Sequence, residues 1–169
     1  MSTPKPAQLE IIAFSITSCQ VAQAAGASRI ELCDNPADGG TTPSWGFIKA
    51  ARETLSIDLY AMVRPRGGDF LYSDDEFEII KSDVAICKEL GCDGVVIGLL
   101  KKDGSVDTER TRQLVALAHP MGVTFHRAFD RTRDPFEALE AVIKTGCERI
   151  LTSGQAPNCP DGSVLIAQL

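Results

Sequence analysis

The chain has 169 residues, 44% of them hydrophobic, which is enough for one domain with a sizeable core. Its formal net charge of -6 argues against a protein that binds nucleic acid through the phosphate backbone, because such proteins carry an excess of Lys and Arg. The first eight residues lack the apolar segment of a secretory signal, and no later stretch is long enough to span a bilayer. The sequence therefore predicts a soluble intracellular protein, with a flexible segment at 1–8 and one domain at 9–169.

Six short apolar or β-branched segments predict strands, and the segments between them have helical periodicity. The predicted strands are 9–14, 29–32, 58–63, 94–99, 122–126 and 149–152. The predicted helices are 18–25, 44–55, 74–90, 107–118 and 135–145, and a further helix begins within 161–169. Asp134 is the expected N-cap of the fifth helix, with Pro135 in its first turn. Gly26, Gly91 and Gly146 each follow a helix, where glycine suits a left-handed turn.

Strands that alternate with helices predict right-handed crossovers and a parallel sheet. Neither a GxGxxG nor a GxxxxGK[ST] motif follows the first strand, which favours a TIM-like (β/α) barrel over an open nucleotide-binding sheet. A complete barrel of this kind has eight strands and about 250 residues. We therefore expect an incomplete barrel of about six β/α units, shortened by truncation, alternative splicing or an incomplete gene model. Its uncovered apolar faces and two strand edges predict either marginal solubility or dependence on self-association.

Active sites of such barrels lie at the carboxyl ends of the strands, which gives weight to the polar residues there. Glu10 and Glu31 lie inside the first two strands, where a buried carboxylate needs a partner. Arg64 and His126, at the ends of the third and fifth strands, are the natural candidates. The four residues form either a catalytic group or a structural ion network that fixes strand register.

The loop that follows the third strand, 64–70, contains Arg64, Arg66 and two glycines. Guanidinium groups and exposed backbone N–H groups are what a carboxylate or phosphate site requires. The alternative is a rigid turn in which Asp69 neutralises one arginine. A second glycine-rich loop, 38–43, precedes the second helix and is expected at the same end of the barrel.

The fifth strand ends in His126, followed by Arg127 and Asp130, and the sixth strand is followed by Ser153. The imidazole and the carboxylate are candidates for acid and base, and Arg127 and Ser153 are candidates for binding a substrate. A lone histidine is more often structural than catalytic, but His126 falls where a barrel places its chemistry.

The six cysteines have no CxxC spacing and are expected to be reduced thiols. They are Cys19, Cys33, Cys87, Cys92, Cys147 and Cys159. Copper(I) prefers thiolate or thioether ligands, and Cys33, directly after the second strand, is the best single candidate. The other cysteines map to helices, helix ends or, for Cys159, a loop.

Five segments taken together resemble the CutC copper homeostasis family, in order and at matching intervals. They are 29–33 (RIELC), 39–44 (GGTTPS), 64–74 (RPRGGDFLYSD), 124–130 (TFHRAFD) and 151–154 (LTSG). The resemblance runs from about residue 9 to residue 155. It implies a TIM-like barrel, a cytoplasmic location, self-association and a role in copper homeostasis with copper binding. It also implies that a polar cluster at the barrel mouth is formed by Glu10, Glu31, Arg64, His126, Asp130 and Ser153.

The resemblance further implies a copper site between a cysteine of the first strand and one at the end of the second. Here Cys33 is present, but the first-strand position is Ile12, so a two-cysteine site cannot form within one chain, and pairing of Cys33 between chains remains open. We therefore expect a cytoplasmic, or alternatively nuclear, copper homeostasis protein with copper as its ligand. The alternatives are a barrel enzyme that acts on a small carboxylate or phosphate, and a shortened product that works only in an assembly.

Overall fold

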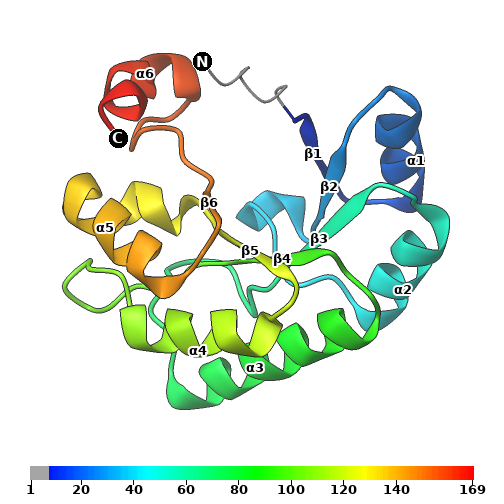
Figure 1. Ribbon diagram of the computed structural model, residues 1–169, viewed down its shortest axis with the longest axis horizontal. Coiled ribbons are helices and arrows are strands. Elements are labelled where there is room, and N and C mark those ends of the chain that lie inside the picture. The colour runs from blue at the N-terminus through cyan, green and yellow to red at the C-terminus, as the bar shows by residue number, and fades with distance from the viewer. Residues whose placement is uncertain (1–7) are drawn as a thin grey trace.

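The structure is a computed structural model that describes residues 8–169, so the segment expected to be flexible lies, except for Gln8, outside the described residues. Six parallel strands pair in chain order and curl into a half-barrel, with helices on the convex side (Figure 1). The strands are β1 (Glu10–Ala13), β2 (Arg29–Leu32), β3 (Asp58–Met62), β4 (Gly94–Ile97), β5 (Gly122–Phe125) and β6 (Arg149–Ile150). This confirms the TIM-like β/α architecture with six units.

The helices alternate with the strands as predicted. They are α1 (Ile16–Ala24), α2 (Trp45–Thr54), α3 (Asp74–Glu89), α4 (Thr108–Ala118), α5 (Pro135–Thr145) and α6 (Cys159–Gln168), with short 3-10 helices η1 (Pro36–Asp38) and η2 (Arg127–Arg131) after β2 and β5. Asp134 caps α5 by accepting the backbone N–H groups of Phe136 and Glu137. Gly146, which ends the same helix, has the expected left-handed backbone, with φ 89°. No helix within residues 8–169 is long and apolar enough to cross a membrane.

The start of the last helix differs from the prediction. Helix α6 begins at Cys159, two residues before Asp161, because the Asn158 side chain accepts the Asp161 N–H and a proline occupies the first turn. Cys159 therefore lies in a helix, and its placement in a loop was wrong. The residue type of Cys159 does not indicate a helix or a loop. Asn158 as an N-cap followed by a proline is a sequence pattern typical of a helix start, and it could have placed the start correctly.

Side chains of the strands alternate between the helix layer and the barrel interior. In β2, Ile30 and Leu32 belong to the main apolar cluster beneath the helices, while Arg29 and Glu31 are buried charged residues. The register places Glu10 opposite Arg29 and Ile12 opposite Glu31. The side of β1 and β2 that faces away from the helices thus carries charged side chains.

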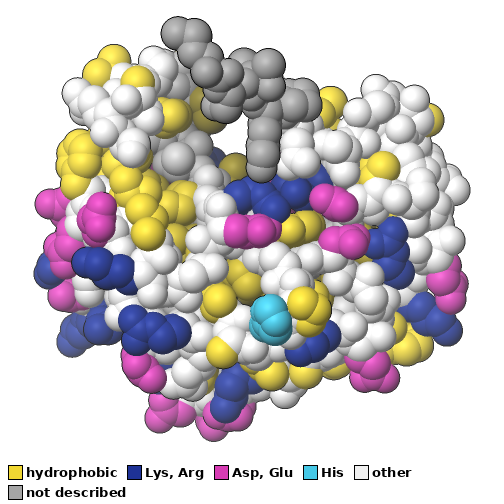
Figure 2. All heavy atoms as spheres, in the orientation of Figure 1, with side chains coloured by type: hydrophobic (Ala, Val, Ile, Leu, Met, Phe, Trp, Pro, Cys, Tyr) yellow, Lys and Arg dark blue, Asp and Glu magenta, His cyan; other side chains and the backbone are white. Residues whose placement is uncertain are grey.

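The Tyr60 side chain of β3 reaches across the half-barrel to β6, where its hydroxyl accepts a hydrogen bond from Arg149 Nη2 at 2.9 Å. Its ring lies between the guanidinium groups of Arg29 and Arg149, at 4.4 Å and 4.7 Å from the ring centroid. A Cβ added at Gly94 would overlap the Tyr60 ring, and one added at Gly122 would overlap the Tyr60 hydroxyl and the Glu148 carboxylate. In Figure 2, basic and acidic side chains gather at the hollow in the centre of the visible face. The Tyr60 ring therefore requires Gly94, and the Tyr60 hydroxyl together with Glu148 requires Gly122.

We expect Gly94→Ala to destabilise the fold by about 1–3 kcal/mol, because the new methyl group would overlap the Tyr60 ring. Urea unfolding would measure this loss. Tyr60→Leu in the same chain should recover part of it, since the smaller side chain leaves room for the methyl. If Gly94→Ala lowered the free energy of unfolding equally in the Tyr60 chain and in the Tyr60→Leu chain, this explanation would be contradicted.

Candidate functional site

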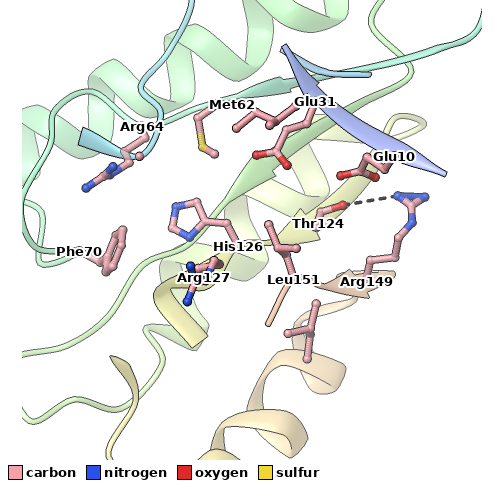
Figure 3. A pocket seen from close by; sticks show the side chains of 13 residues that line it. Glu10, Glu31, Met62, Arg64, Phe70, Thr124, His126, Arg127, Arg149 and Leu151 are labelled. Carbon is pink, nitrogen blue, oxygen red and sulfur yellow. Dashed lines mark hydrogen bonds between the residues drawn. The ribbon is translucent and has the colours of Figure 1, made fainter. Parts of the chain in front are cut away.

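A pocket of about 530 Å³ opens on the concave side of the sheet toward the carboxyl ends of the strands. Residues of five of the six β/α units line it, with none from β4 or α4 (Figure 3): Glu10, Ile12, Glu31, Gly39, Met62, Arg64, Phe70, Thr124, His126, Arg127, Arg149, Ile150 and Leu151. The pocket brings together five of the predicted site residues: Glu10, Glu31, Arg64, His126 and Arg127. The site lies where β/α barrels hold their ligands.

Arg64 joins the two glycine-rich loops at the edge of this pocket. Its Nη1 donates to the carbonyl oxygens of Asp38 and Gly40, at 2.7 Å and 2.9 Å, and its Nη2 donates to the Gly68 carbonyl at 2.9 Å. The guanidinium is buried and stacks on Phe70, 5.0 Å from the ring centroid. Within residues 8–169 no carboxylate forms an ion pair with Arg64. Its positive charge is therefore fixed by neutral groups and not neutralised.

Glu10 has a different partner from the one predicted. Its carboxylate pairs with Arg29 at 2.9 Å, and Arg29 also reaches Asp58 at 3.3 Å. The expectation that Arg64 would be the partner of the strand carboxylates was wrong, since Arg64 is turned toward the loops. The register explains the choice, because Glu10 and Arg29 lie directly opposite each other on adjacent strands.

Glu31 is buried in the pocket wall without an ion-pair partner among the described residues. Burial raises the pKa of its carboxyl to about 7, and the nearby charge of Glu10 acts in the same direction. The Cys33 thiol donates to Glu31 Oε1 at 3.7 Å. Glu31 thus exchanges a proton near neutral pH, which suits a general acid or base.

His126 is buried at the end of β5, with its ring 5.0 Å from that of Phe70 and against the backbone of Gly98. Its Nδ1 accepts the N–H of Ala128 at 3.1 Å. Burial lowers the pKa of the imidazole to about 3, and the charge of Arg64 adds to this effect. The imidazole is therefore neutral at physiological pH.

Asp130 and Ser153 are hydrogen-bonded to each other and fix the segment after β6. The Asp130 carboxylate accepts the Ser153 N–H and hydroxyl, at 3.1 Å and 3.0 Å, and the Gln155 N–H at 3.1 Å. Burial acts to raise the pKa of Asp130, but hydrogen bonds from Thr152 and Arg127 outweigh it and lower that pKa. Neither Asp130 nor Ser153 lines the pocket, so both position other groups.

Arg127 and Arg66 differ in their relation to the pocket. Arg127 lines it and is oriented by Asp130 at 2.8 Å and Ser153 at 2.6 Å. Arg66 pairs with Glu76 and with Asp69, at 3.1 Å for the latter, and does not line the pocket. The alternative of a rigid turn neutralised by Asp69 describes the surroundings of Arg66.

Sequence reasoning missed Arg149, Met62, Thr124 and Phe70 among the lining residues. Arg149 reaches the pocket from β6, with its Nη1 3.4 Å from Thr124 Oγ1, and the two residues are in register. The period-2 alternation that placed His126 inside also places Thr124 there, so this residue could have been found. Phe70 reaches the pocket from a loop, for which no periodicity exists.

Cys33 does not line the pocket and is fully buried. Burial raises the pKa of its thiol well above the usual range, with Glu31 contributing in the same direction. Within residues 8–169 no group of three or more His, Cys, Asp or Glu side chains is arranged to hold a metal ion. These observations oppose a preformed thiolate site. One soft neighbour is present, because Met62 belongs to the same buried cluster.

Comparison with known proteins places these features in a family. The family model for CutC matches residues 7–169. The chain belongs to the CutC family. A CutC family protein of Chromobacterium violaceum is 60% identical over 161 residues, which are 95% of this chain and 65% of that protein. One of Vibrio vulnificus is 54% identical over 96% of this chain and 66% of its own length. The chain thus spans about two-thirds of the length of these CutC relatives.

The crystal structure of the putative copper homeostasis protein CutC from Streptococcus agalactiae has a TM-score of 0.89 and 35% sequence identity to this chain. It matches over 96% of this chain and 81% of its own. The predicted CutC resemblance and the half-barrel arrangement of the six strands are therefore confirmed together.

Replacing Glu31 should change the pH dependence of stability. Because its folded pKa of about 7 is above the ordinary value of 4.5, the folded protein holds the extra proton and loses stability as pH rises from 4.5 through 7. We expect Glu31→Gln to leave stability almost unchanged at pH 4.5 and to raise it at pH 8 by up to about 3 kcal/mol. Urea unfolding at both pH values would measure this. Glu137→Gln, on the exposed surface, is the matched control, and an equal gain at both pH values would contradict the explanation.

Proposed function

We propose that this CutC protein binds a small organic anion, a carboxylate or a phosphate, in the pocket at the barrel mouth and acts on it as an enzyme. The observation that carries the proposal is the buried guanidinium of Arg64, whose described hydrogen-bond partners are neutral backbone carbonyls. A buried charge without a counter-charge is costly unless a ligand supplies one. A bound anion would do so.

Further groups around the pocket support an anion. Arg127 reaches it from η2 and Arg149 from β6, and each also pairs with one carboxylate, Arg127 with Asp130 and Arg149 with Glu148. Arginine binds carboxylate and phosphate groups through paired N–H donors. Glu31 and His126 provide the groups for acid or base chemistry, and Asp130 and Ser153 hold Arg127 in place. Glu10 stays bound to Arg29 and is a poor candidate for proton transfer.

Oxalate and inorganic phosphate are suitable probes of this site. We expect at least one of them to bind in isothermal titration calorimetry, and Arg64→Gln to weaken its binding at least about tenfold, since a charge-assisted pair contributes more than about 1.4 kcal/mol. Because Arg64 also joins two loops, Arg127→Gln provides a second variant with the same expected direction. Arg133→Gln, on the surface, is the matched control. Binding of neither probe, or equal binding by all three variants, would contradict the proposal.

A second candidate function is copper(I) binding at Cys33, because the Streptococcus agalactiae relative is named a putative copper homeostasis protein. One structural observation favours it. A Cβ added at Gly40 would lie 3.1 Å from Cys33 Sγ and 3.7 Å from Met62 Cε, so a thiol and a thioether flank the same glycine. Two sulfur ligands suit copper(I), but the raised thiol pKa works against it.

Copper binding at this pair predicts uptake of one copper(I) per chain, measured by competition with a chromophoric copper(I) chelator. Cys33→Ser should abolish the uptake and Met62→Leu should weaken it, because each removes one sulfur ligand. Cys147→Ser is the matched control. Undiminished uptake by the Cys33→Ser variant would exclude this ligand.

We propose in addition that copies of the chain associate and that the protein acts in the cytoplasm. Support for association comes from the exposed apolar side chains Phe136, Ile143 and Val164 on α5 and α6, the region where hydrophobic side chains gather in Figure 2. The edge strands β1 and β6, each paired on one side within the described chain, present further backbone groups for association.

A further inference from the structure

Two buried nitrogen atoms at the pocket have no hydrogen-bond partner within the described chain: His126 Nε2 and Arg64 Nε. The Arg64 atom is an N–H donor. The His126 atom is also a donor, because Nδ1 accepts the Ala128 N–H and a neutral imidazole must then carry its proton on Nε2. A buried donor without an acceptor costs about 1–3 kcal/mol. An oxygen atom of a bound ligand would give each of these two donors an acceptor.

The tautomer of His126 is fixed by the protein and not by the ligand. The Ala128 N–H belongs to the backbone of η2, which His126 itself caps, so the ring cannot reverse without losing that bond. Phe70 packs against the ring, and Gly98 leaves the space that the ring occupies, because a Cβ at Gly98 would overlap it. A neutral, fixed N–H donor stabilises an oxygen atom that gains negative charge during a reaction.

Glu31 complements this donor. In Figure 3 its carboxyl group and the His126 ring point into the same hollow, from β2 and β5. Glu31 is buried in the pocket wall without an ion-pair partner among the described residues, so its carboxyl group is free to accept a proton from a ligand and to return it. An ionised carboxylate would repel a phosphate dianion placed against it, whereas it tolerates a C–H bond. The pair therefore favours proton transfer from carbon over phosphate chemistry.

We propose that the pocket takes a small carboxylate that carries a carbonyl group beside a C–H bond, the chemistry of a 2-oxo acid, and interconverts its keto and enolate forms. Glu31 removes the proton. The C–H electron pair forms the new C=C bond, the carbonyl π pair moves to oxygen, and the His126 Nε2–H hydrogen-bonds that oxygen. Return of the proton from Glu31 restores the starting compound, so no other reactant is needed. This inference rests on the anion site proposed above.

The test uses the full chain in D₂O with pyruvate, and proton NMR follows the loss of its methyl signal through exchange for deuterium. We expect exchange well above the buffer rate. Glu31→Gln should reduce it at least about 10²-fold, the usual contribution of a general base, while binding of oxalate, a planar enolate mimic without a C–H bond, is kept. His126→Phe should reduce it by about 10², whereas His126→Asn, which keeps an N–H donor, should retain part of it. Glu137→Gln and His119→Asn are the matched controls.

A second measurement does not depend on turnover. In protein with ¹⁵N-labelled histidine, the two-bond ¹H–¹⁵N spectrum, assigned with His119→Asn, should show His126 as the neutral Nε2–H tautomer from pH 5 to pH 8. An imidazolium or an Nδ1–H tautomer would overturn the proposal. So would oxalate binding that depends on Arg64 without any exchange of pyruvate protons, a result that leaves the anion site intact. Failure of oxalate and phosphate alike to bind would overturn the anion site together with the proposal.

Discussion

The guanidinium of Arg64 is the contact on which the mouth of this half-barrel depends. Its three hydrogen bonds to carbonyl oxygens tie the loop after β2 to the loop after β3. Carbonyl oxygens orient the guanidinium without cancelling its charge, which an ion pair would do. The same charge helps keep His126 neutral. One residue thus shapes the loops, supplies a positive potential and adds to the effect of burial that lowers the pKa of His126.

The other charges of the half-barrel are arranged so that this one remains uncompensated. Glu10 pairs with Arg29. Asp130 pairs with Arg127 and accepts backbone N–H groups after β6. The Tyr60 ring contacts the guanidinium groups of both Arg29 and Arg149. Glu31 is left in the wall with a raised pKa. Its burial costs stability above neutral pH, a common price of a reactive group held in a site.

Copper and anion chemistry make different demands on the same end of the barrel. A copper(I) site needs deprotonated sulfur, and Cys33 is buried, protonated and outside the pocket. An anion site needs fixed donors and positive charge, which Arg64, Arg127 and His126 present on the pocket wall. The membership in the CutC family and the chemistry of the pocket are therefore separate conclusions, and the second stands on the side chains alone.

The sequence by itself determined the alternation of strands and helices, the Asp134 cap and the family, because periodicity, caps and motif order are local properties of the chain. It also placed Glu31, Arg64 and His126 at one end of the sheet, since parallel strands end at the same edge. Only the tertiary structure decided which charges pair. The strand register places Glu10 opposite Arg29, so these two residues pair. The loop geometry directs Arg64 to backbone carbonyls and Arg66 to Glu76. Pairing depends on distances between segments far apart in the chain, and burial, which sets the pKa values of Glu31 and His126, is a property of the assembled fold.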